Sequence, residues 1–245
     1  STDGPVDEHE GYLLRIRNVL SVICPCCVKL DAFRFKIDKS HLGYNLYMQE
    51  YEYIVLSSNV IENNKPIKVK TPLWLHQETV CENVMELINK FGHRGFGDAS
   101  QVGSGKTLTA LNICSKLSYL SATNFLVLCA NTCLYKVWED EVAKHIENAN
   151  FYLQTAKGVW EQKITVNSKN NIYCTTMGRN RDHFDKLPKL DFVIIDECLT
   201  VQNKEAKWTQ KAYATISKSK YGVLMLSATF FRTRFDKLLF MLRML

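Results

Sequence analysis

At 245 residues the chain can bury one large core or two small ones, and 46% hydrophobic with 23% charged residues is the composition of a folded globular protein. No apolar run approaches the roughly 20 residues that span a bilayer, and no charged-then-apolar signal sequence opens the chain, so neither a membrane protein nor a secreted one is expected. The nine cysteines are scattered and odd in number, which favours free thiols in a reducing compartment, the cytoplasm or the nucleus.

The net charge of +6 is unevenly distributed along the chain. Residues 1–75 hold nine of the 31 basic residues and nine of the 25 acidic ones, so all of the excess positive charge lies in residues 76–245. A modest basic excess fits nucleic-acid binding, and a solvated surface explains it nearly as well.

The first 70 residues contain alternating aromatic stretches, AFRFKI at 32–37 and YNLYMQEYEYIVL at 44–56. Such alternation indicates short antiparallel strands, so we expect a β-rich N-terminal module over residues 1–70. No motif assigns this module a role. It could contact nucleic acid or a partner subunit, or it could elaborate the edge of the next domain. The segment ENNKPIKVKTP at 62–72 has the breakers of a turn and a linker.

The cluster Cys24-Pro25-Cys26-Cys27 suggests a zinc or redox site. A structural zinc site needs four ligands, and the next candidates are His41 and the distant Cys81, which falls in a helical stretch. Free thiols in a turn are therefore the favoured interpretation, and no metal is assigned here.

From residue 73 onward, helical stretches alternate with short apolar runs, which predicts an α/β domain over residues 71–245. Four runs without polar alternation indicate a parallel sheet covered by helices on both faces: FLVLCA at 125–130, NIYCTT at 171–176, FVIID at 192–196 and GVLMLSAT at 222–229. Each run ends in polar or small residues. The carboxyl ends of parallel strands form the ligand crevice of open α/β sheets, so we expect the chemistry at that edge.

The stretch Gly103-Ser104-Gly105-Lys106-Thr107 lies between a short apolar run and a helix-like run. Glycines let the backbone curl around a phosphate chain, a lysine reaches the outer phosphates, and a hydroxyl ligates magnesium. The complete pattern G-x-x-x-x-G-K-[ST] has glycine where this chain has Ser100, so the loop alone is only suggestive.

A second stretch, LDFVIIDECLTVQN, places Asp196 and Glu197 at the end of a strand, about 90 residues after Lys106. Magnesium prefers oxygen ligands such as the Asp196 carboxylate, and Glu197 can orient the water that attacks a phosphoryl group. This order and spacing favour a P-loop NTPase over an unused pair of surface acids.

With these motifs the chain resembles the first RecA-like lobe of a superfamily 2 helicase, in particular the Swi/Snf-type translocases. In that family the leading glycine of motif I is commonly a small residue such as Ser100. Six segments match the helicase motifs in order, namely LWLHQ (73–77, Q motif), SQVGSGKT (100–107, motif I), LVLCANTCLYKVWEDEVAKH (126–145, motif Ia), IYCTTMGRNR (172–181, motif Ib), VIIDECLTVQNKEAKWTQ (193–210, motif II) and LMLSATFFRTRFDKLLFMLRML (224–245, motif III).

The resemblance implies a RecA-like P-loop parallel sheet that binds ATP and magnesium. It assigns the nucleotide contacts to residues around the loop: Gln77, Ser100, Gly103, Ser104, Gly105, Lys106, Thr107 and Leu108. Lys106 would contact the outer phosphates, and Gln77 would read the adenine edge. Thr107 and Asp196 would hold magnesium, and Glu197 would position the hydrolytic water.

The resemblance also assigns contacts with a nucleic-acid backbone, DNA or RNA, to Thr132, Thr176 and Arg179. Ser227, Ala228 and Thr229 would couple the nucleotide site to the strand-tracking surface. Contacts with phosphates carry no base information, so the sequence does not identify the polymer.

Two departures from the family pattern bear on activity. Leu199 stands in motif II where the family usually has His or Asp, which puts the polar contact between motifs II and III in doubt. Phe230 stands where many relatives have proline. The motifs also stop with motif III, so the second lobe that the family requires, with its arginine finger, lies outside these residues. Since an arginine finger contributes a factor of about 10³–10⁵ in rate, we expect slow hydrolysis by this lobe alone.

Several other residues have two interpretations from sequence. Trp74 could stack on adenine or pack the linker against the sheet. Arg232 and Arg234 could face nucleic acid or solvent. His145 and His183 are predicted to be surface residues, and the methionines and the apolar stripe LLFMLRML are predicted to lie in the core or on the face that meets the second lobe.

The primary hypothesis is the ATPase lobe of a nucleic-acid-dependent helicase or translocase, acting with a second RecA-like lobe and possible further subunits. A second hypothesis is a nucleotide-binding scaffold lobe that does not turn over, for which Leu199 is the supporting feature. A third, a P-loop kinase, is weaker because kinases do not need the Ser-Ala-Thr stretch at 227–229.

Overall fold

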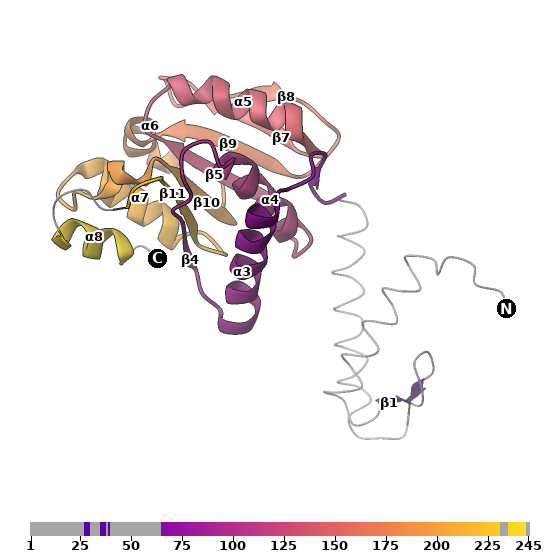
Figure 1. The fold of residues 1–245 in the computed structure, drawn as a ribbon. Helices are drawn as coiled ribbons and strands as arrows, with labels where there is room; N and C mark the ends of the chain where they lie inside the picture. Colours follow the sequence, from indigo (N-terminus) through magenta and orange to yellow (C-terminus); the bar gives the residue numbers. More distant parts are fainter. Residues whose placement is uncertain (1–26, 30–34, 38, 40–64, 231–234, 244–245) are drawn as a thin grey trace. The chain divides into compact units, whose positions relative to one another are not determined.

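The computed structural model describes residues 27–29, 35–37, 39, 65–230 and 235–243 (Figure 1). The chain divides into two compact units, residues 1–63 and 64–245. In the first unit an antiparallel pair is described, β1 (Cys27–Lys29) with β2 (Phe35–Ile37). The strands predicted at 44–56, together with Cys24, Cys26, Arg232 and Arg234, lie outside the described residues.

The second unit is built on a seven-stranded sheet in the order β4-β11-β10-β5-β9-β7-β8. The first six of these strands run parallel, and β8 pairs antiparallel with β7. The strands are β4 (Gly95–Asp98), β5 (Asn124–Cys129), β7 (Asn150–Gln154), β8 (Trp160–Ile164), β9 (Asn171–Thr176), β10 (Phe192–Asp196) and β11 (Val223–Leu226). All four predicted strands are confirmed. The hairpin of β7 and β8 was not predicted, because WEQKI reads as an exposed polar segment.

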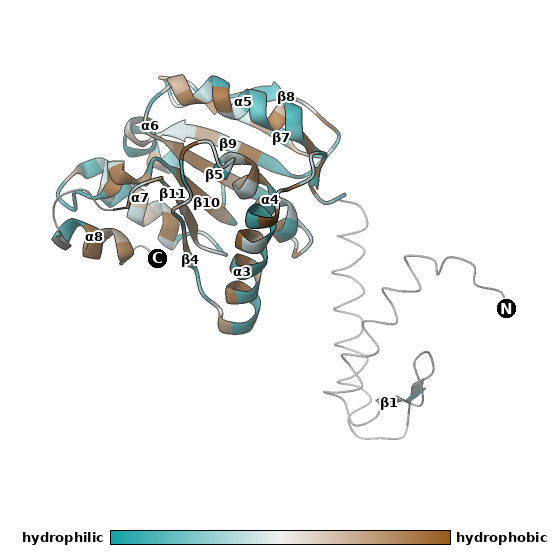
Figure 2. Ribbon diagram, in the orientation of Figure 1, coloured by the Kyte–Doolittle hydropathy of each residue, from teal (hydrophilic) through white to brown (hydrophobic). Residues whose placement is uncertain are grey.

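Helices cover both faces of this sheet, as the absence of polar alternation in the strands indicates (Figure 1). Phe125, Val127 and Ile194 face a core shared with α3, α4 and α5, while Leu126 and Val193 face a second core shared with α6, α7 and α8. The central strands are accordingly the most hydrophobic part of the fold (Figure 2). The helices are α3 (Leu75–Phe91), α4 (Lys106–Ser118), α5 (Cys133–His145), α6 (Met177–Asp182), α7 (Lys207–Ser217) and α8 (Phe235–Leu242), with the 3-10 turns η1 (Phe184–Lys186) and η2 (Cys198–Val201).

The side chains of α8 divide between core and surface, in line with the two alternatives left open by sequence. Met241 is fully buried, whereas Leu239 and Leu242 are 46% and 44% exposed. Within the described part of the chain, no helix has the length and apolarity needed to cross a membrane.

The prediction that residues 62–72 form a linker is wrong for the second half of this segment. Ile67 is fully buried, its N–H donates to Ser118 Oγ at 2.9 Å, and its carbonyl accepts from Ser115 Oγ at 2.6 Å. The next residues form β3 (Lys68–Val69), which pairs antiparallel with β6 (Ile146–Glu147). Helix α4 thus supplies the two hydroxyls that tie this segment to the second unit, a long-range contact that the local breakers Asn63, Asn64 and Pro66 do not reveal.

A row of side-chain amides crosses the amino edge of the sheet over four neighbouring strands. Asn171 Nδ2 donates to Asn124 Oδ1 at 3.0 Å, and Asn150 Nδ2 donates to Asn171 Oδ1 at 3.2 Å. Gln162 Nε2 completes the row by donating to Asn150 Oδ1 at 3.1 Å. The amide row therefore links β5, β9, β7 and β8 at the end opposite the predicted chemistry.

The prediction that His145 lies on the surface is wrong. His145 ends α5 and is only 4% exposed; its Nδ1 is hydrogen-bonded to Thr71 Oγ1, and its Nε2 lies 3.4 Å from the Glu141 carboxylate. The polar neighbours of His145 in the sequence do not reveal its burial, because Thr71, which packs on the ring, lies 74 residues earlier in the chain. His183 is half-buried, with its Nε2 bonded to the carbonyl of Ala156.

Burial lowers the pKa of His145 below its usual value of 6.5, and the Glu141 carboxylate only partly opposes this shift. The unfolded chain therefore binds this proton more readily than the folded one, so the free energy of unfolding should fall as the pH drops through about 6.5. Thermal unfolding between about pH 7.5 and about pH 5.5 checks this expectation. His145→Gln should flatten the pH dependence; an unchanged slope in that variant would rule His145 out as its source.

Candidate functional site

The predicted site residues meet at the carboxyl edge of the sheet. The loop 99–105 follows β4, and Ser227 follows β11. Asp196 is the last residue of β10, and Glu197 comes directly after it. In the sheet, β11 lies between β4 and β10. On the other side of β10, Thr132 follows β5 and Thr176 ends β9. The sheet order therefore places the loop and the carboxylates at one end of this edge and the nucleic-acid candidates at the other.

The loop between β4 and α4 has the backbone of a phosphate cradle. Gly103 and Gly105 have φ values of 80° and 77°, and Gly105 is the residue that caps the N-terminus of α4. The φ of Gly105 favours glycine by conformation, and a Cβ at this position would lie 2.3 Å from Gln77 Nε2, so that the Gln77 amide would have to move. The N–H groups that start α4 point toward the loop, where a helix N-terminus favours an anion.

Lys106 and Ser104 provide polar groups around this cradle. Lys106 Nζ donates to the carbonyls of Ser100 and Gln101, each at 2.8 Å, which holds its positive charge over the loop. The hydroxyl oxygen of Ser104 is buried without a hydrogen-bond partner. A buried orphan hydroxyl beside positive-φ glycines fits a phosphate group, which carries acceptor oxygens.

Asp98 is a residue of the candidate site that the sequence analysis missed. It is 3% exposed at the end of β4, and its Oδ1 accepts from the N–H of Ser100 at 2.9 Å and from the Ser100 hydroxyl. Its own carbonyl accepts from the N–H of Ser227 at 3.2 Å. Asp98 thus braces the start of the loop and joins it to motif III. The sequence signal that could have indicated Asp98 is an acidic residue at the end of a strand, two residues before Ser100.

Gln77 is also part of the loop's support. It is 3% exposed, and its Nε2 donates to the carbonyls of Ser104 at 3.1 Å and Gly105 at 3.3 Å, while its Oε1 accepts from the N–H of Trp74 at 2.9 Å. The amide is therefore directed at the loop backbone in this structure. His76 reinforces the same contact through Nε2, 3.0 Å from the Ser104 carbonyl.

Trp74 does not pack the linker against the sheet, since its side chain is 66% exposed. It precedes α3 as its N-cap residue, close to the loop through the Gln77 contact. Leu75 and Val102 are likewise 80% and 88% exposed. Exposed apolar side chains thus flank the loop, where a nucleotide base would find stacking area.

Asp196 ends β10 with its carboxylate partly buried. Oδ2 accepts from the indole N–H of Trp138 at 3.0 Å. Burial raises the pKa of the Asp196 carboxyl above its usual value and the charge of Glu197 adds to this, whereas the Trp138 hydrogen bond and the positive charge of Lys106 oppose it. The strand order β4-β11-β10 places motifs I and II two strands apart at the same edge of the sheet. From sequence, Trp138 is only one residue within the segment 126–145 that matches motif Ia.

The residues present at this edge fit magnesium. Among the described residues no group of three or more His, Cys, Asp or Glu side chains is placed to hold a metal. Magnesium does not need such a group, because it keeps several waters and is held by one or two protein oxygens together with substrate phosphates. Thr107, the second residue of α4, and Asp196 supply such oxygens.

Glu197 has an unusual backbone for a residue with a side chain. Its φ is 54° and its ψ 58°, in the left-handed region, and it starts the turn η2. This conformation costs about 1–2 kcal/mol for a non-glycine residue and often marks a functional site. The bend exposes the Glu197 side chain while the next residue, Cys198, turns into the core.

The contact between motifs II and III does not involve a polar group at position 199. Leu199 is 9% exposed, and Ser227 Oγ donates to the Thr229 carbonyl at 2.7 Å within its own turn. Burial raises the pKa of the Cys198 thiol to about 12, and the charge of Glu197 adds to this rise. Cys198 is fully buried one residue before Leu199. In motif III, Ala228 and Thr229 are exposed beyond Ser227.

The three nucleic-acid candidates differ in accessibility. Thr132 is exposed as the residue before α5, whereas the Thr176 hydroxyl caps α6 by accepting from the N–H of Arg179 at 3.2 Å. The Arg179 guanidinium donates to the Tyr135 hydroxyl at 2.9 Å and to the Gln154 carbonyl, and it lies 5.2 Å from the centre of the Tyr135 ring. In this structure only Thr132 is fully presented at the edge.

Two sequence comparisons are informative. A family model described as "Type III restriction enzyme, res subunit" matches residues 70–232. The chain is also 41% identical over 244 residues to "Putative helicase L115" of Acanthamoeba polyphaga mimivirus. That alignment covers 96% of this chain and 19% of the viral protein, so the chain spans about a fifth of the length of this relative.

Solved structures show the same fold. The Sulfolobus solfataricus SWI2/SNF2 ATPase core in complex with dsDNA has 25% sequence identity and a TM-score of 0.61, covering 75% of this chain and 37% of that one. A nuclease-deletion mutant of the type ISP restriction-modification enzyme LlaGI has 16% identity and a TM-score of 0.52, covering 65% of this chain and 18% of that one. The second similarity concerns the fold alone. Because the family match extends over more than half of the residues, the chain belongs to the family of the type III restriction enzyme res subunit, as the first RecA-like lobe of a superfamily 2 helicase.

Proposed function

We propose that this lobe binds ATP with magnesium and hydrolyses its β–γ bond as part of a nucleic-acid-dependent helicase or translocase. The family supports a helicase-like ATPase in general terms. The observation that carries the finer proposal is the placement of the glycine loop with Lys106, after β4, and of Asp196 and Glu197, at the end of β10, at the same edge of the sheet with only β11 between these strands. A phosphate cradle, a magnesium ligand and a water-positioning acid are the parts that phosphoryl transfer to water requires.

Each residue has a role in this proposal. The loop N–H groups and Lys106 hold the phosphates, and the Ser104 hydroxyl adds a donor. Thr107 and Asp196 hold magnesium, which neutralises charge on the phosphates when bound. Glu197 orients the attacking water, and Trp74 stacks on the base. Gln77, which donates to the carbonyls of Ser104 and Gly105, transmits base binding to the loop.

We further propose that Thr132, at the exposed start of α5, contacts a nucleic-acid backbone, with Thr176 and Arg179 supporting the same surface. The Sulfolobus solfataricus SWI2/SNF2 ATPase core named above was solved in complex with dsDNA, which favours DNA. The exposed Leu239 and Leu242 of α8 offer an apolar face to a second RecA-like lobe, within a polypeptide or complex larger than these residues. The buried free thiols Cys81, Cys114, Cys129, Cys174 and Cys198 support a reducing compartment, the cytoplasm or the nucleus.

Lys106→Ala is expected to abolish nucleic-acid-stimulated ATP hydrolysis, because it removes the cation that compensates charge on the outer phosphates. The test measures steady-state hydrolysis by the longest natural polypeptide containing these residues, with no polymer, duplex DNA, single-stranded DNA or RNA. Stimulation of the unsubstituted protein by one polymer, lost in Lys106→Ala, supports the proposal and names the polymer. Equal rates for the two proteins with every polymer would refute it.

A matched control is Lys116→Ala in the same helix, ten residues further on. Lys116 lies in the last turn of α4, away from the loop. This variant should keep the stimulated rate, which separates the loss of a phosphate contact from a general loss of positive charge on α4.

A second candidate function is a nucleotide-binding scaffold lobe that does not turn over. The observation that favours it is the buried, apolar Leu199, which leaves position 199 without a polar contact to motif III.

A further inference from the structure

We propose that Trp138 is a positioning residue for the magnesium site: its indole N–H holds one oxygen of the Asp196 carboxylate and so orients the other oxygen toward the metal. This inference rests on the proposed function, because it takes Asp196 as a magnesium ligand. It adds a residue of α5, a helix otherwise associated with the nucleic-acid edge, to the machinery of the nucleotide site.

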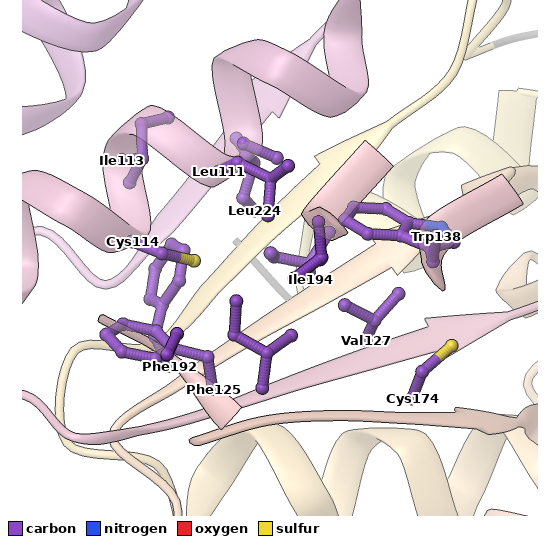
Figure 3. Packing of buried hydrophobic residues seen from close by; sticks show 14 of the residues in the cluster. Leu111, Ile113, Cys114, Phe125, Val127, Trp138, Cys174, Phe192, Ile194 and Leu224 are labelled. Atoms are coloured by element: carbon purple, nitrogen blue, oxygen red, sulfur yellow. The ribbon is translucent and has the colours of Figure 1, made fainter. Parts of the chain in front are cut away.

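The hydrogen bond between Trp138 and Asp196 has a defined geometry because the indole is enclosed in the core. Trp138 Nε1 lies 3.0 Å from Asp196 Oδ2, and the Trp138 side chain is fully buried. The indole packs in the same hydrophobic cluster as Val127 of β5 and Ile194 of β10, the strand that ends in Asp196 (Figure 3). A ring enclosed by these strands has little rotational freedom, so it offers its N–H in one direction.

The partner of Trp138 distinguishes it from the other tryptophans whose indole bonds are described. Trp160 Nε1 donates to the carbonyl of Lys186 at 3.1 Å, and Trp208 Nε1 donates to the carbonyl of Thr200 at 3.2 Å. Those bonds satisfy a donor with a neutral backbone acceptor. Trp138 instead donates to a carboxylate, and a hydrogen bond to a charged acceptor is roughly twice as strong as a neutral one.

A carboxylate needs such a partner to act as a reliable ligand. An aspartate has two equivalent oxygens, and a metal is bound more tightly when an outer hydrogen bond fixes which oxygen faces it. With Oδ2 engaged by Trp138, Oδ1 is the oxygen left for magnesium or for a water that magnesium holds. Loss of an outer partner of this kind typically costs about 10- to 100-fold in metal affinity.

The location of Trp138 in α5 connects two parts of the edge. Thr132, the exposed candidate for nucleic-acid contact, is the residue before α5 begins, and Trp138 lies in the middle of the same helix. A helix is a stiff element, so a shift of its N-terminus also moves the indole that holds Asp196. The inference therefore supplies a direct physical connection between the nucleic-acid edge and the metal site.

The test uses the 245-residue chain and a fluorescent ATP analogue, with magnesium titrated at fixed nucleotide. Trp138→Phe keeps a buried aromatic ring but removes the N–H. It should raise the magnesium concentration at half-saturation by about 10- to 100-fold, while nucleotide affinity in the presence of a chelator stays unchanged. Trp160→Phe, the same chemical change at the β8 edge, should alter neither quantity. A merely structural role of Trp138 would move both affinities together.

Different outcomes refute the proposed function and the role of Trp138. If the unsubstituted chain binds nucleotide with no dependence on magnesium, the proposed function fails. If its nucleotide binding depends on magnesium, but Trp138→Phe and Trp160→Phe are half-saturated at the same magnesium concentration, only the role of Trp138 is overturned.

A second measurement, on the unsubstituted chain, does not require that Trp138→Phe folds. The four tryptophans give four indole N–H signals in a proton–nitrogen correlation spectrum. Trp74→Phe, Trp160→Phe and Trp208→Phe assign three of them, and the fourth belongs to Trp138. Magnesium added to the nucleotide-bound chain should shift the Trp138 signal and leave the Trp160 signal in place. An unmoved Trp138 signal at saturating magnesium contradicts the proposal.

Discussion

Glu197→Gln should lower the rate of ATP hydrolysis by about 10²–10⁴-fold, the usual contribution of a general base, while ATP binding is retained. Glutamine keeps the size of the side chain and removes the basic carboxylate. The side chain is exposed at the carboxyl edge, whereas the left-handed backbone at φ 54° holds it in place beside Asp196. Hydrolysis is measured in a single turnover with saturating nucleic acid, and binding is measured separately with a fluorescent nucleotide.

A matched control is Glu205→Gln, an exposed acid eight residues further along the chain, which should leave the rate unchanged. The comparison also separates the two candidate functions. In an ATPase, Glu197→Gln loses turnover and keeps binding. If the unsubstituted protein binds ATP but both glutamine variants and the unsubstituted protein hydrolyse it at the same negligible rate, the scaffold interpretation based on Leu199 holds.

Gly222→Ala should destabilise the fold by about 3–5 kcal/mol, which is among the largest effects expected of one methyl group. Gly222 precedes β11 with a φ of 87°, and a Cβ at this position would lie 1.7 Å from the carbonyl oxygen of Arg94. That carbonyl accepts from the N–H of Val223 at 2.8 Å, and the Gly222 carbonyl accepts from the N–H of Val193 at 3.0 Å. The backbone cannot move aside without breaking the pairing of β11 with β4 or β10.

Gly92→Ala isolates the conformational part of this effect. Gly92 ends α3 with a φ of 65°, and no atom lies within 4 Å of a Cβ placed there. Its substitution should cost only about 1–2 kcal/mol, the strain of a left-handed alanine. Chemical denaturation gives both free energies of unfolding. Equal losses in the two variants would show that the Arg94 carbonyl yields and that the steric argument for Gly222 is wrong.

The parts of the fold that could be predicted from sequence are those encoded by short segments. The runs FVIID and GVLMLSAT are apolar up to their polar C-terminal ends because β10 and β11 are covered on both faces, and this composition is visible without a structure. The glycine loop with Lys106 and the Asp196–Glu197 pair are likewise contiguous motifs. Their meeting at one edge follows from the parallel arrangement of the strands.

The parts that could not be predicted depend on contacts between distant residues. Ile67 reads as part of a linker until Ser115 and Ser118 are placed beside it, and His145 reads as a surface residue until Thr71 covers it. The polar partners inside the site also come from distant parts of the sequence. Trp138 lies 58 residues from Asp196 in sequence, and no local pattern predicts which donor a buried carboxylate will find.

The row of amides at the amino edge of the sheet determines how the strands are aligned. Asn124, Asn171 and Asn150 are each the first residue of their strand and lie directly opposite one another. Their bonds form only when the three strand starts are level, and a slip of one residue would turn every side chain of a strand to the other face. The row therefore sets the register that brings Thr132 and Thr176 to the opposite edge together. Residues a full strand length from the carboxyl edge thus help to decide which side chains line the proposed nucleic-acid surface.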